Sequence, residues 1–215
     1  MEATIKILIY IHAFFGGLGL ITGIGSIIVK KGSVLHKKMG KLFSIGMVTS
    51  SLISIPISWM PNHENLFLFL IGLFTIYLVI AGNRALTFKT REKADPIDRI
   101  ISGSMLFFSA AMILIGFYGV INSISMSILY LFFGGFGLLL SIQDFRFYNT
   151  LSRPKNAWLI SHIGKMIGAL IASVTAFIIA GLSFTNIIAW TLPTVLGTLY
   201  IMYWKRKMRV KTITS

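Results

Sequence analysis

W-L-I-S-H-I-G-K-M-I-G-A-L-I-A-S-V-T-A-F-I-I-A, residues Trp158–Ala180, is the stretch that decides the fold class. As a helix it is long enough to cross a bilayer, for which about 20 apolar residues suffice. Small residues recur along it at every fourth position, a spacing that lets another helix approach closely within lipid. They are Gly164, Gly168, Ala172, Ala176 and Ala180. His162 and Lys165 lie one turn apart near its start, and ionisable groups inside a membrane span indicate a functional site.

Composition extends the membrane assignment to the whole chain. Of its 215 residues, 55% are hydrophobic and 12% are charged, with a mean hydropathy of +0.83, whereas soluble domains carry about 25% charged residues. The net charge of +14 would suggest nucleic acid in a soluble protein, but the basic residues cluster between apolar runs, as in cytoplasmic loops. The absence of cysteine excludes disulfides, thiolate metal sites and cysteine nucleophiles. We therefore expect a lipid bilayer, and not nucleic acid, as the main partner.

Seven apolar runs qualify as membrane spans. They are Ile5–Val29, Gly40–Met60, Asn65–Leu86, Arg99–Ile121, Ile124–Gln143, Ala157–Gly181 and Ile187–Trp204. Every Lys and Arg other than Lys6 and Lys165 falls on one side of the membrane. This side holds the loops after the first, third and fifth spans and the C-terminus. The positive-inside rule then places the N-terminus outside and the C-terminus inside. We interpret the first run as a retained span because it lacks a basic leader and a cleavage site.

An internal repeat indicates how the spans are arranged. F-F-G-G-L-G-L at Phe14–Leu20 returns as F-F-G-G-F-G-L at Phe132–Leu138, with six of seven residues identical. Basic loops then lead to His36, just before the second span, and to His162 in the sixth span. The sequence thus predicts an all-α integral membrane protein with one domain, residues 1–215. Its two parallel three-helix repeats, 1–90 and 123–215, are related by an axis along the membrane normal and joined by a linker helix at 91–122.

The paired histidines His36 and His162 are the first candidate site. A parallel duplication brings equivalent residues to opposite sides of the central axis, where two imidazoles could ligate one divalent metal or the iron of haem b. Lys165 would supply charge for propionates or another anion. The alternative is that His36 is solvated among lysines at the interface, while His162 is a hydrogen-bonded packing residue.

His12 is a further candidate and lies on the glycine-rich face of the first span. A second pair with His63 of the outer loop would create a transmembrane electron path. We favour the simpler interpretation, in which His12 is buried and bonded to a backbone carbonyl.

Several other polar residues could serve a transport pathway. Near the midplane these are the hydroxyls of Ser50, Ser54, Ser173 and Thr175, although such hydroxyls usually bond to their own helix. Arg84 and Asp144, at the ends of their spans, could gate or polarise the His162 region, whereas Asp98 reads as a helix cap. No Asp or Glu occupies the central part of a predicted span, which argues against a carboxylate proton relay.

The order of motifs resembles a known group of proteins. His12 precedes K-G-S-V-L-H-K-K-M-G-K at Lys31–Lys41, and H-I-G-K-M-I-G-A at His162–Ala169 precedes T-A-F at Thr175–Phe177 and W-T-L-P-T at Trp190–Thr194. Most of the chain thereby resembles bacterial multipass membrane proteins that share domain of unknown function 2306. The resemblance implies seven spans in the bacterial cytoplasmic (inner) membrane and no established activity. Histidines of such families invite comparison with b-type cytochromes, whose usual pair of His on one helix is missing here.

The 3+1+3 layout with an outer N-terminus also resembles the SWEET sugar transporters. This analogy is one of architecture alone, because their proline pattern is not matched: inside the spans only Pro56 and Pro193 occur. Three interpretations follow: a haem- or metal-binding redox protein that could use a quinone, a small-solute transporter, and a regulatory partner with no ligand of its own. We lead with the redox interpretation because the histidines are the candidate chemistry.

Overall fold

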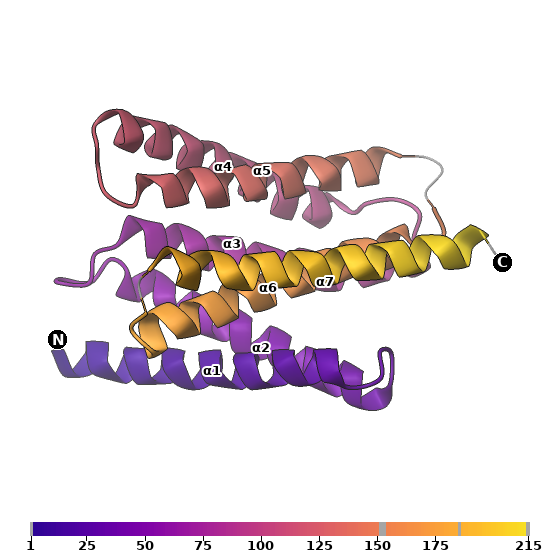
Figure 1. Cartoon of the computed structure of the whole chain (residues 1–215), viewed down its shortest axis with the longest axis horizontal. Helices are drawn as coiled ribbons and strands as arrows, with labels where there is room; N and C mark the ends of the chain where they lie inside the picture. The colour runs from indigo at the N-terminus through magenta and orange to yellow at the C-terminus, as the bar shows by residue number, and fades with distance from the viewer. Residues whose placement is uncertain (1, 151–153, 185, 214–215) are drawn as a thin grey trace.

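The chain folds into seven long helices that run alternately in opposite directions along the longest axis (Figure 1). They are α1 (Glu2–Ile28), α2 (Val34–Ile57), α3 (Leu66–Ala85), α4 (Pro96–Ile121), α5 (Ser127–Asn149), α6 (Ala157–Ala176) and α7 (Ile187–Ile213). A 3-10 turn, Leu86–Lys89, extends α3, and a π-helical turn, Phe177–Gly181, ends α6. This computed structural model describes residues 2–150, 154–184 and 186–213, and this part contains no strand. Helices α1 to α6 are each long and apolar enough to cross a membrane, which indicates a multipass membrane protein.

Local capping sets the starts of two helices earlier than the hydrophobic pattern predicts. Helix α2 begins at Val34 rather than Gly40, because the Ser33 hydroxyl accepts a hydrogen bond from the His36 backbone N–H at 3.2 Å. His36 therefore lies in the first turn of α2 and not in the loop before it.

Helix α4 likewise begins at Pro96 and not at Arg99. Asp95 is the residue before the helix, and its backbone N–H donates to Asp98 Oδ2 at 2.8 Å in a reciprocal capping box. The expected capping role of Asp98 is confirmed. Asp98 lies within the first turn of α4 and accepts from the backbone N–H of the residue before the helix.

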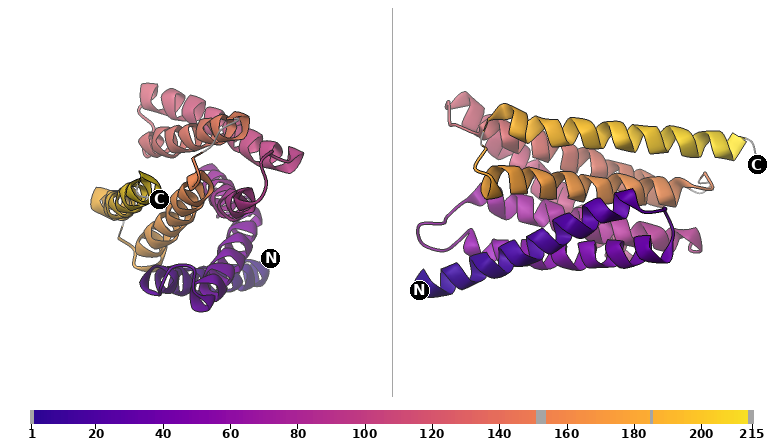
Figure 2. Two further views of the ribbon diagram at one scale, coloured as in Figure 1. Left: turned by 90° about the vertical axis from the view of Figure 1, so that its right-hand side faces the viewer. Right: turned by 60° about the horizontal axis from the view of Figure 1, so that its bottom comes forward.

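Helix α3 lies at the centre of the molecule. Its side chains Phe74, Tyr77, Leu78 and Val79 form the middle of the buried apolar core, and it packs against α2, α4 and α6. The end-on view in Figure 2 shows the α4–α5 hairpin on one side of this centre and the α1–α2 hairpin on the other. Helices α6 and α7 form a third pair, and α6 packs against α1 as well as α3.

The two copies of the glycine motif each close a hairpin. In α1, Gly19 lies so near Gly46 of α2 that a Cβ on Gly46 would be 2.8 Å from the Gly19 backbone N. In α5, a Cβ on Gly134 would be 3.0 Å from Met112 of α4. The first copy thus joins α1 to the helix after it and the second joins α5 to the helix before it. The predicted duplication requires α5 to pair with α6 as α1 does with α2, so the helix pairing gives it no support.

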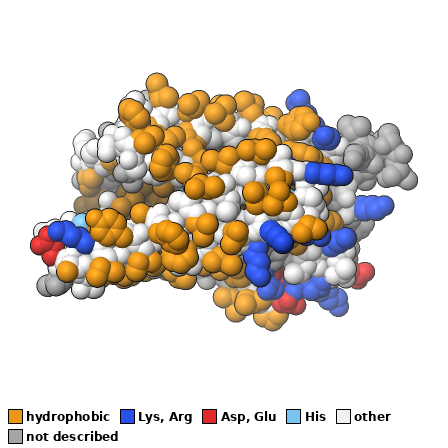
Figure 3. Space-filling view, turned by 90° about the horizontal axis from the view of Figure 1, so that it is seen from below, with side chains coloured by type: hydrophobic (Ala, Val, Ile, Leu, Met, Phe, Trp, Pro, Cys, Tyr) orange, Lys and Arg blue, Asp and Glu red, His pale blue; other side chains and the backbone are white. Residues whose placement is uncertain are grey.

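Charge is distributed unevenly along the molecule. Figure 3 shows most of the Lys and Arg side chains gathered at one end of the molecule, while apolar side chains cover much of the surface between the ends. Lys6, at the opposite end, forms an ion pair with Glu2 at 2.9 Å. A wide apolar girdle with one basic end is typical of a protein embedded in a bilayer.

Candidate functional site

A buried ion pair joins α5 to α6 inside the apolar bundle. Lys165 Nζ lies 2.5 Å from Asp144 Oδ1, and the two residues are only 4% and 3% exposed. The other carboxylate oxygen, Oδ2, accepts hydrogen bonds from the Tyr77 hydroxyl at 2.8 Å and from Ser102 Oγ at 2.9 Å. The ammonium also donates to Ser161 Oγ at 2.8 Å. Asp144 is therefore bound by side chains from α3, α4 and α6 at once.

The network extends one residue further toward the basic end. Ser102 Oγ and the Tyr148 hydroxyl lie 3.0 Å apart, and the Tyr148 ring stacks on Phe88 of the turn after α3. Because one ammonium neutralises one carboxylate and neutral hydroxyls supply the remaining bonds, the cluster carries no net charge. This is the arrangement in which charged groups are tolerated within a membrane.

The position of Asp144 corrects the predicted boundary of the fifth span. The apolar run ends at Gln143, but α5 continues to Asn149 and Asp144 lies within it. The predicted span ends before Asp144 because a carboxylate lowers the mean hydropathy of the run. In the structure, Lys165 pairs with this carboxylate inside the bundle, so the helix continues past it. Asp144 therefore lies inside α5 but only five residues from its end, outside the central part of the span that the argument against a carboxylate relay concerned.

A second charged cluster lies at the basic end, where α3 leads into α4. The Asp98 carboxylate accepts hydrogen bonds from Arg84 Nε, and from Arg91 Nη2 at 2.5 Å. Arg84 also reaches Asp95 Oδ2 at 3.1 Å. The Asp98 side chain is 1% exposed, but the arginines are about a quarter exposed, so water reaches one side of this cluster. Arg84 is thus engaged with Asp98 and Asp95, whereas Asp144 pairs with Lys165 one turn from His162.

The three intramembrane histidines share one feature. Each has its Nδ1 within hydrogen-bond distance of a backbone carbonyl: His12 with Ser50 at 2.9 Å, His36 with Ser26 at 2.9 Å, and His162 with Gly82 at 2.8 Å. A carbonyl only accepts, so Nδ1 carries a proton in each ring, and in the neutral form of the ring Nε2 has the lone pair. The carbonyl-bonded interpretation of His12 is confirmed.

The pairing of His36 with His162 stays a prediction. The two rings bond to carbonyls of different helices, His36 to Ser26 of α1 and His162 to Gly82 of α3. Within the described residues no group of three or more His, Asp or Glu side chains is placed to hold a metal ion.

The predicted pathway hydroxyls lie mainly in helix contacts. Ser50 Oγ donates to the His12 carbonyl at 3.0 Å, and Ser54 Oγ bonds its own helix at Ser51. Ser173 and Thr175 are both buried in α6. The Thr175 hydroxyl has no hydrogen-bond partner in the part of the chain that the structure describes.

Sequence reasoning missed Tyr77, Ser102 and Tyr148 as members of the site. A tyrosine in the middle of the apolar run of α3 was a usable signal, since a buried phenol needs a hydrogen-bond partner. Ser102 gave none, because a serine in a span usually bonds to its own backbone.

Comparison of the chain with models of protein families, with curated protein sequences and with solved structures finds no match.

Proposed function

We propose that this protein is a proton-coupled membrane carrier of a small solute, with Asp144 and Lys165 as its coupling site. The observation that carries the proposal is the buried pair itself, whose carboxylate is held by three different helices. Carboxylates and amines inside membrane spans mark ion pathways and proton relays.

The α4–α5 hairpin is the element that would respond to the proton. It packs on the other helices mainly through α3, and α5 makes little contact with α6 apart from the Lys165–Asp144 pair. Its ion pairs to the rest of the described chain are made by Asp144 and Asp98. When Asp144 takes up a proton from the cytoplasmic water, the attraction to Lys165 is lost and the hairpin swings away from α6.

The opposite half of the hairpin would act as the pivot. There, Phe67 of α3 contacts the rings of Tyr130 and Phe133 on α5, and Trp190 of α7 contacts Phe133. These contacts are apolar and do not change with pH. In this proposal all seven helices span the membrane, and the basic end with both charged clusters faces the cytoplasm, as the positive-inside rule requires.

The test measures distances between pairs of spin labels. The chain has no cysteine, so labels attach only to cysteines that are introduced by substitution. Ile97→Cys with Lys38→Cys reports the basic end of the hairpin, and Ile124→Cys with Trp59→Cys reports the pivot end. All four side chains are exposed. In liposomes, lowering the pH from 8 to 5 should lengthen the first distance and leave the second unchanged.

Asp144→Asn supplies the decisive control, because it removes the charge as protonation does. It should give the long distance at both pH values and abolish proton-driven uptake of labelled sugars, polyols or amino acids by proteoliposomes. Distances that respond to neither acid nor Asp144→Asn would contradict the proposal.

The histidines support a second function, a redox protein with a haem or divalent metal between His36 and His162. The supporting observation is the Nδ1–carbonyl bond of each ring, which leaves Nε2 to ligate, as second-shell bonds do in metal proteins. A haem or a redox-active metal ion there would supply one-electron chemistry. His36 and His162 would hold it and Lys165 would lie beside it as a charge.

An optical spectrum and metal analysis of the purified protein test this second function. A Soret band or bound metal that His36→Ala and His162→Ala each remove, while His63→Ala does not, would support it. A colourless, metal-free, folded protein would exclude it and would leave the carrier proposal unaffected.

A further inference from the structure

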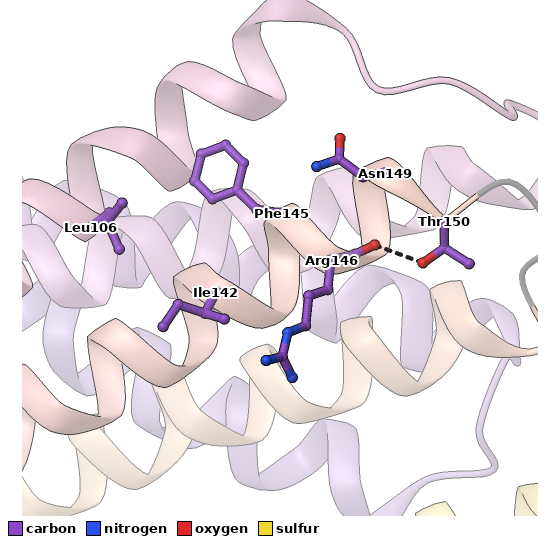
Figure 4. Close-up of a pocket in the computed structure, with 6 residues that line it drawn as sticks. All are labelled: Leu106, Ile142, Phe145, Arg146, Asn149 and Thr150. Carbon is purple, nitrogen blue, oxygen red and sulfur yellow. Dashed lines mark hydrogen bonds between the residues drawn. The ribbon is translucent and has the colours of Figure 1, made fainter.

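The α4–α5 hairpin carries a groove on its surface, close to the basic end. Leu106 of α4 and Ile142 and Phe145 of α5 form its apolar part, and Arg146, Asn149 and Thr150 surround the end nearer the loop. Figure 4 shows the Arg146 side chain extending from α5 one turn beyond Ile142, with Asn149 and Thr150 following at the end of the helix. The groove thus passes from apolar to cationic and polar along the direction of the helices.

Two guanidinium groups are available at the polar end. Arg146 is exposed, and within the described residues no carboxylate lies within ion-pair distance of it. Arg99 of α4 donates to Asn149 Oδ1 at 3.2 Å, so a second exposed arginine lies beside Asn149, which extends from α5 on the other side from Arg146 (Figure 4). The Arg84 and Arg91 cations, by contrast, are already paired with Asp98 and Asp95.

The position of the groove defines what can occupy it. Leu106 lies ten residues into α4, about 15 Å from the start of the helix. If α4 spans the membrane, its start lies at the interface. A ligand must therefore be apolar over that depth and anionic at the interface. An anionic phospholipid has this form, since arginine binds phosphate oxygens bidentately and an acyl chain fills an apolar groove.

We propose that this groove binds one anionic phospholipid, with its phosphate on Arg146 and Arg99 and an acyl chain against Leu106, Ile142 and Phe145. The groove lies on the surface of the α4–α5 hairpin, which moves in the proposed carrier mechanism. Lipid binding at the groove does not depend on that mechanism.

Native mass spectrometry of the delipidated full chain in detergent tests the site, with phosphatidylglycerol and phosphatidylcholine as the two probes. One phosphatidylglycerol should bind about tenfold more tightly than phosphatidylcholine. Arg146→Gln should reduce its affinity about fivefold, and so should Arg99→Gln, which provides an independent readout if the first variant does not fold. Lys38→Gln removes an exposed charge at the same end on α2 and should have no effect.

Two further measurements distinguish the contribution of the lipid headgroup from that of the acyl chain. Ile142→Asn should weaken both lipids, and glycerol 3-phosphate, which has the phosphate but no chain, should not compete. The proposal is overturned if Arg146→Gln and Arg99→Gln bind like the unmodified chain, if the two lipids bind equally, if Ile142→Asn binds both lipids as before, or if glycerol 3-phosphate displaces the lipid.

Discussion

The α1–α2 and α4–α5 hairpins are closed by the same glycine motif, yet they are attached to the central helix in different ways. The first hairpin packs on α3 through α2 and on α6 through α1, and a neutral side-chain hydrogen bond joins it to α3, from Asn83 Nδ2 to Ser44 Oγ at 2.9 Å. The second packs on α3 less extensively and adds two buried aspartates, Asp144 and Asp98, that pair with cations of the neighbouring elements.

This difference matters because neutral and charged attachments respond differently to protons. A hydrogen bond between an amide and a hydroxyl does not respond to pH, whereas an ion pair inside a membrane is lost when either partner changes its protonation state. The same hairpin design therefore yields a fixed unit on one side of α3 and an electrostatically held unit on the other.

The largest expected effect comes from breaking the buried pair. Asp144→Asn or Lys165→Met alone should each lower the free energy of unfolding by about 3–5 kcal/mol, because the remaining charge is left unpaired in the bundle. The double variant should recover much of this loss, since no lone charge remains. A double-mutant cycle by denaturant unfolding in detergent measures the coupling, and additive losses would show that the pair does not hold the hairpin.

The glycine contacts test whether the two hairpins are internally alike. Gly46→Ala places a Cβ 2.8 Å from backbone atoms of α1, and Gly116→Ala places one 2.9 Å from the Leu131 backbone N in α5. Each should cost about 2–3 kcal/mol, because backbone atoms cannot move aside as flexible side chains can.

Gly17→Ala and Gly135→Ala are the matched controls. They lie at the same position of the two motifs, and a Cβ there meets nothing within 4 Å. Both should be neutral or slightly stabilising in a melting experiment. A loss confined to one hairpin would mean that the shared motif is a coincidence of composition.

The second charged cluster should matter less than the first. Asp98→Asn should cost about 1–2 kcal/mol, because Arg84 and Arg91 are partly exposed and water can take the place of the carboxylate. Asp95→Asn, whose side chain is 49% exposed, should cost less than about 1 kcal/mol. Unfolding in detergent distinguishes the two, and a loss from Asp98→Asn as large as that from Asp144→Asn would place both clusters in equally dry surroundings.

The sequence was sufficient for the membrane class and for the approximate positions of the helices, because both depend on local composition. It also singled out Lys165 and Asp144, since a charge in or next to an apolar run is conspicuous. What it could not provide was their pairing. Asp144 and Lys165 are 21 residues apart and Tyr77 is 67 residues from Asp144, so their contact depends on how α5 and α6 pack on α3.

The repeated glycine motif likewise shows that the sequence did not reveal which helices pair. F-F-G-G-x-G-L predicts that a helix will pack closely on another, and both copies do so. It does not encode whether the partner precedes or follows it in the chain. Similarity of packing was therefore visible in the sequence, whereas the three-helix duplication inferred from it required partner identities that the motif does not contain.

The smallest expected effect compares the same substitution in the two hairpins. Ser50 of α2 and Ser102 of α4 are both buried, but Ser50 Oγ donates to the His12 carbonyl, whereas Ser102 Oγ donates to the Asp144 carboxylate. Ser50→Ala should cost about 0.6 kcal/mol, the average for neutral hydrogen bonds between membrane helices. Ser102→Ala should cost about 1.5 kcal/mol, because its acceptor is charged. In the Lys165→Met/Asp144→Asn background the acceptor is neutral, and the cost of Ser102→Ala should fall to the value for Ser50→Ala. Persistence of the larger cost there would assign it to packing around Ser102, and the charge on Asp144 would then not be what distinguishes the second hairpin.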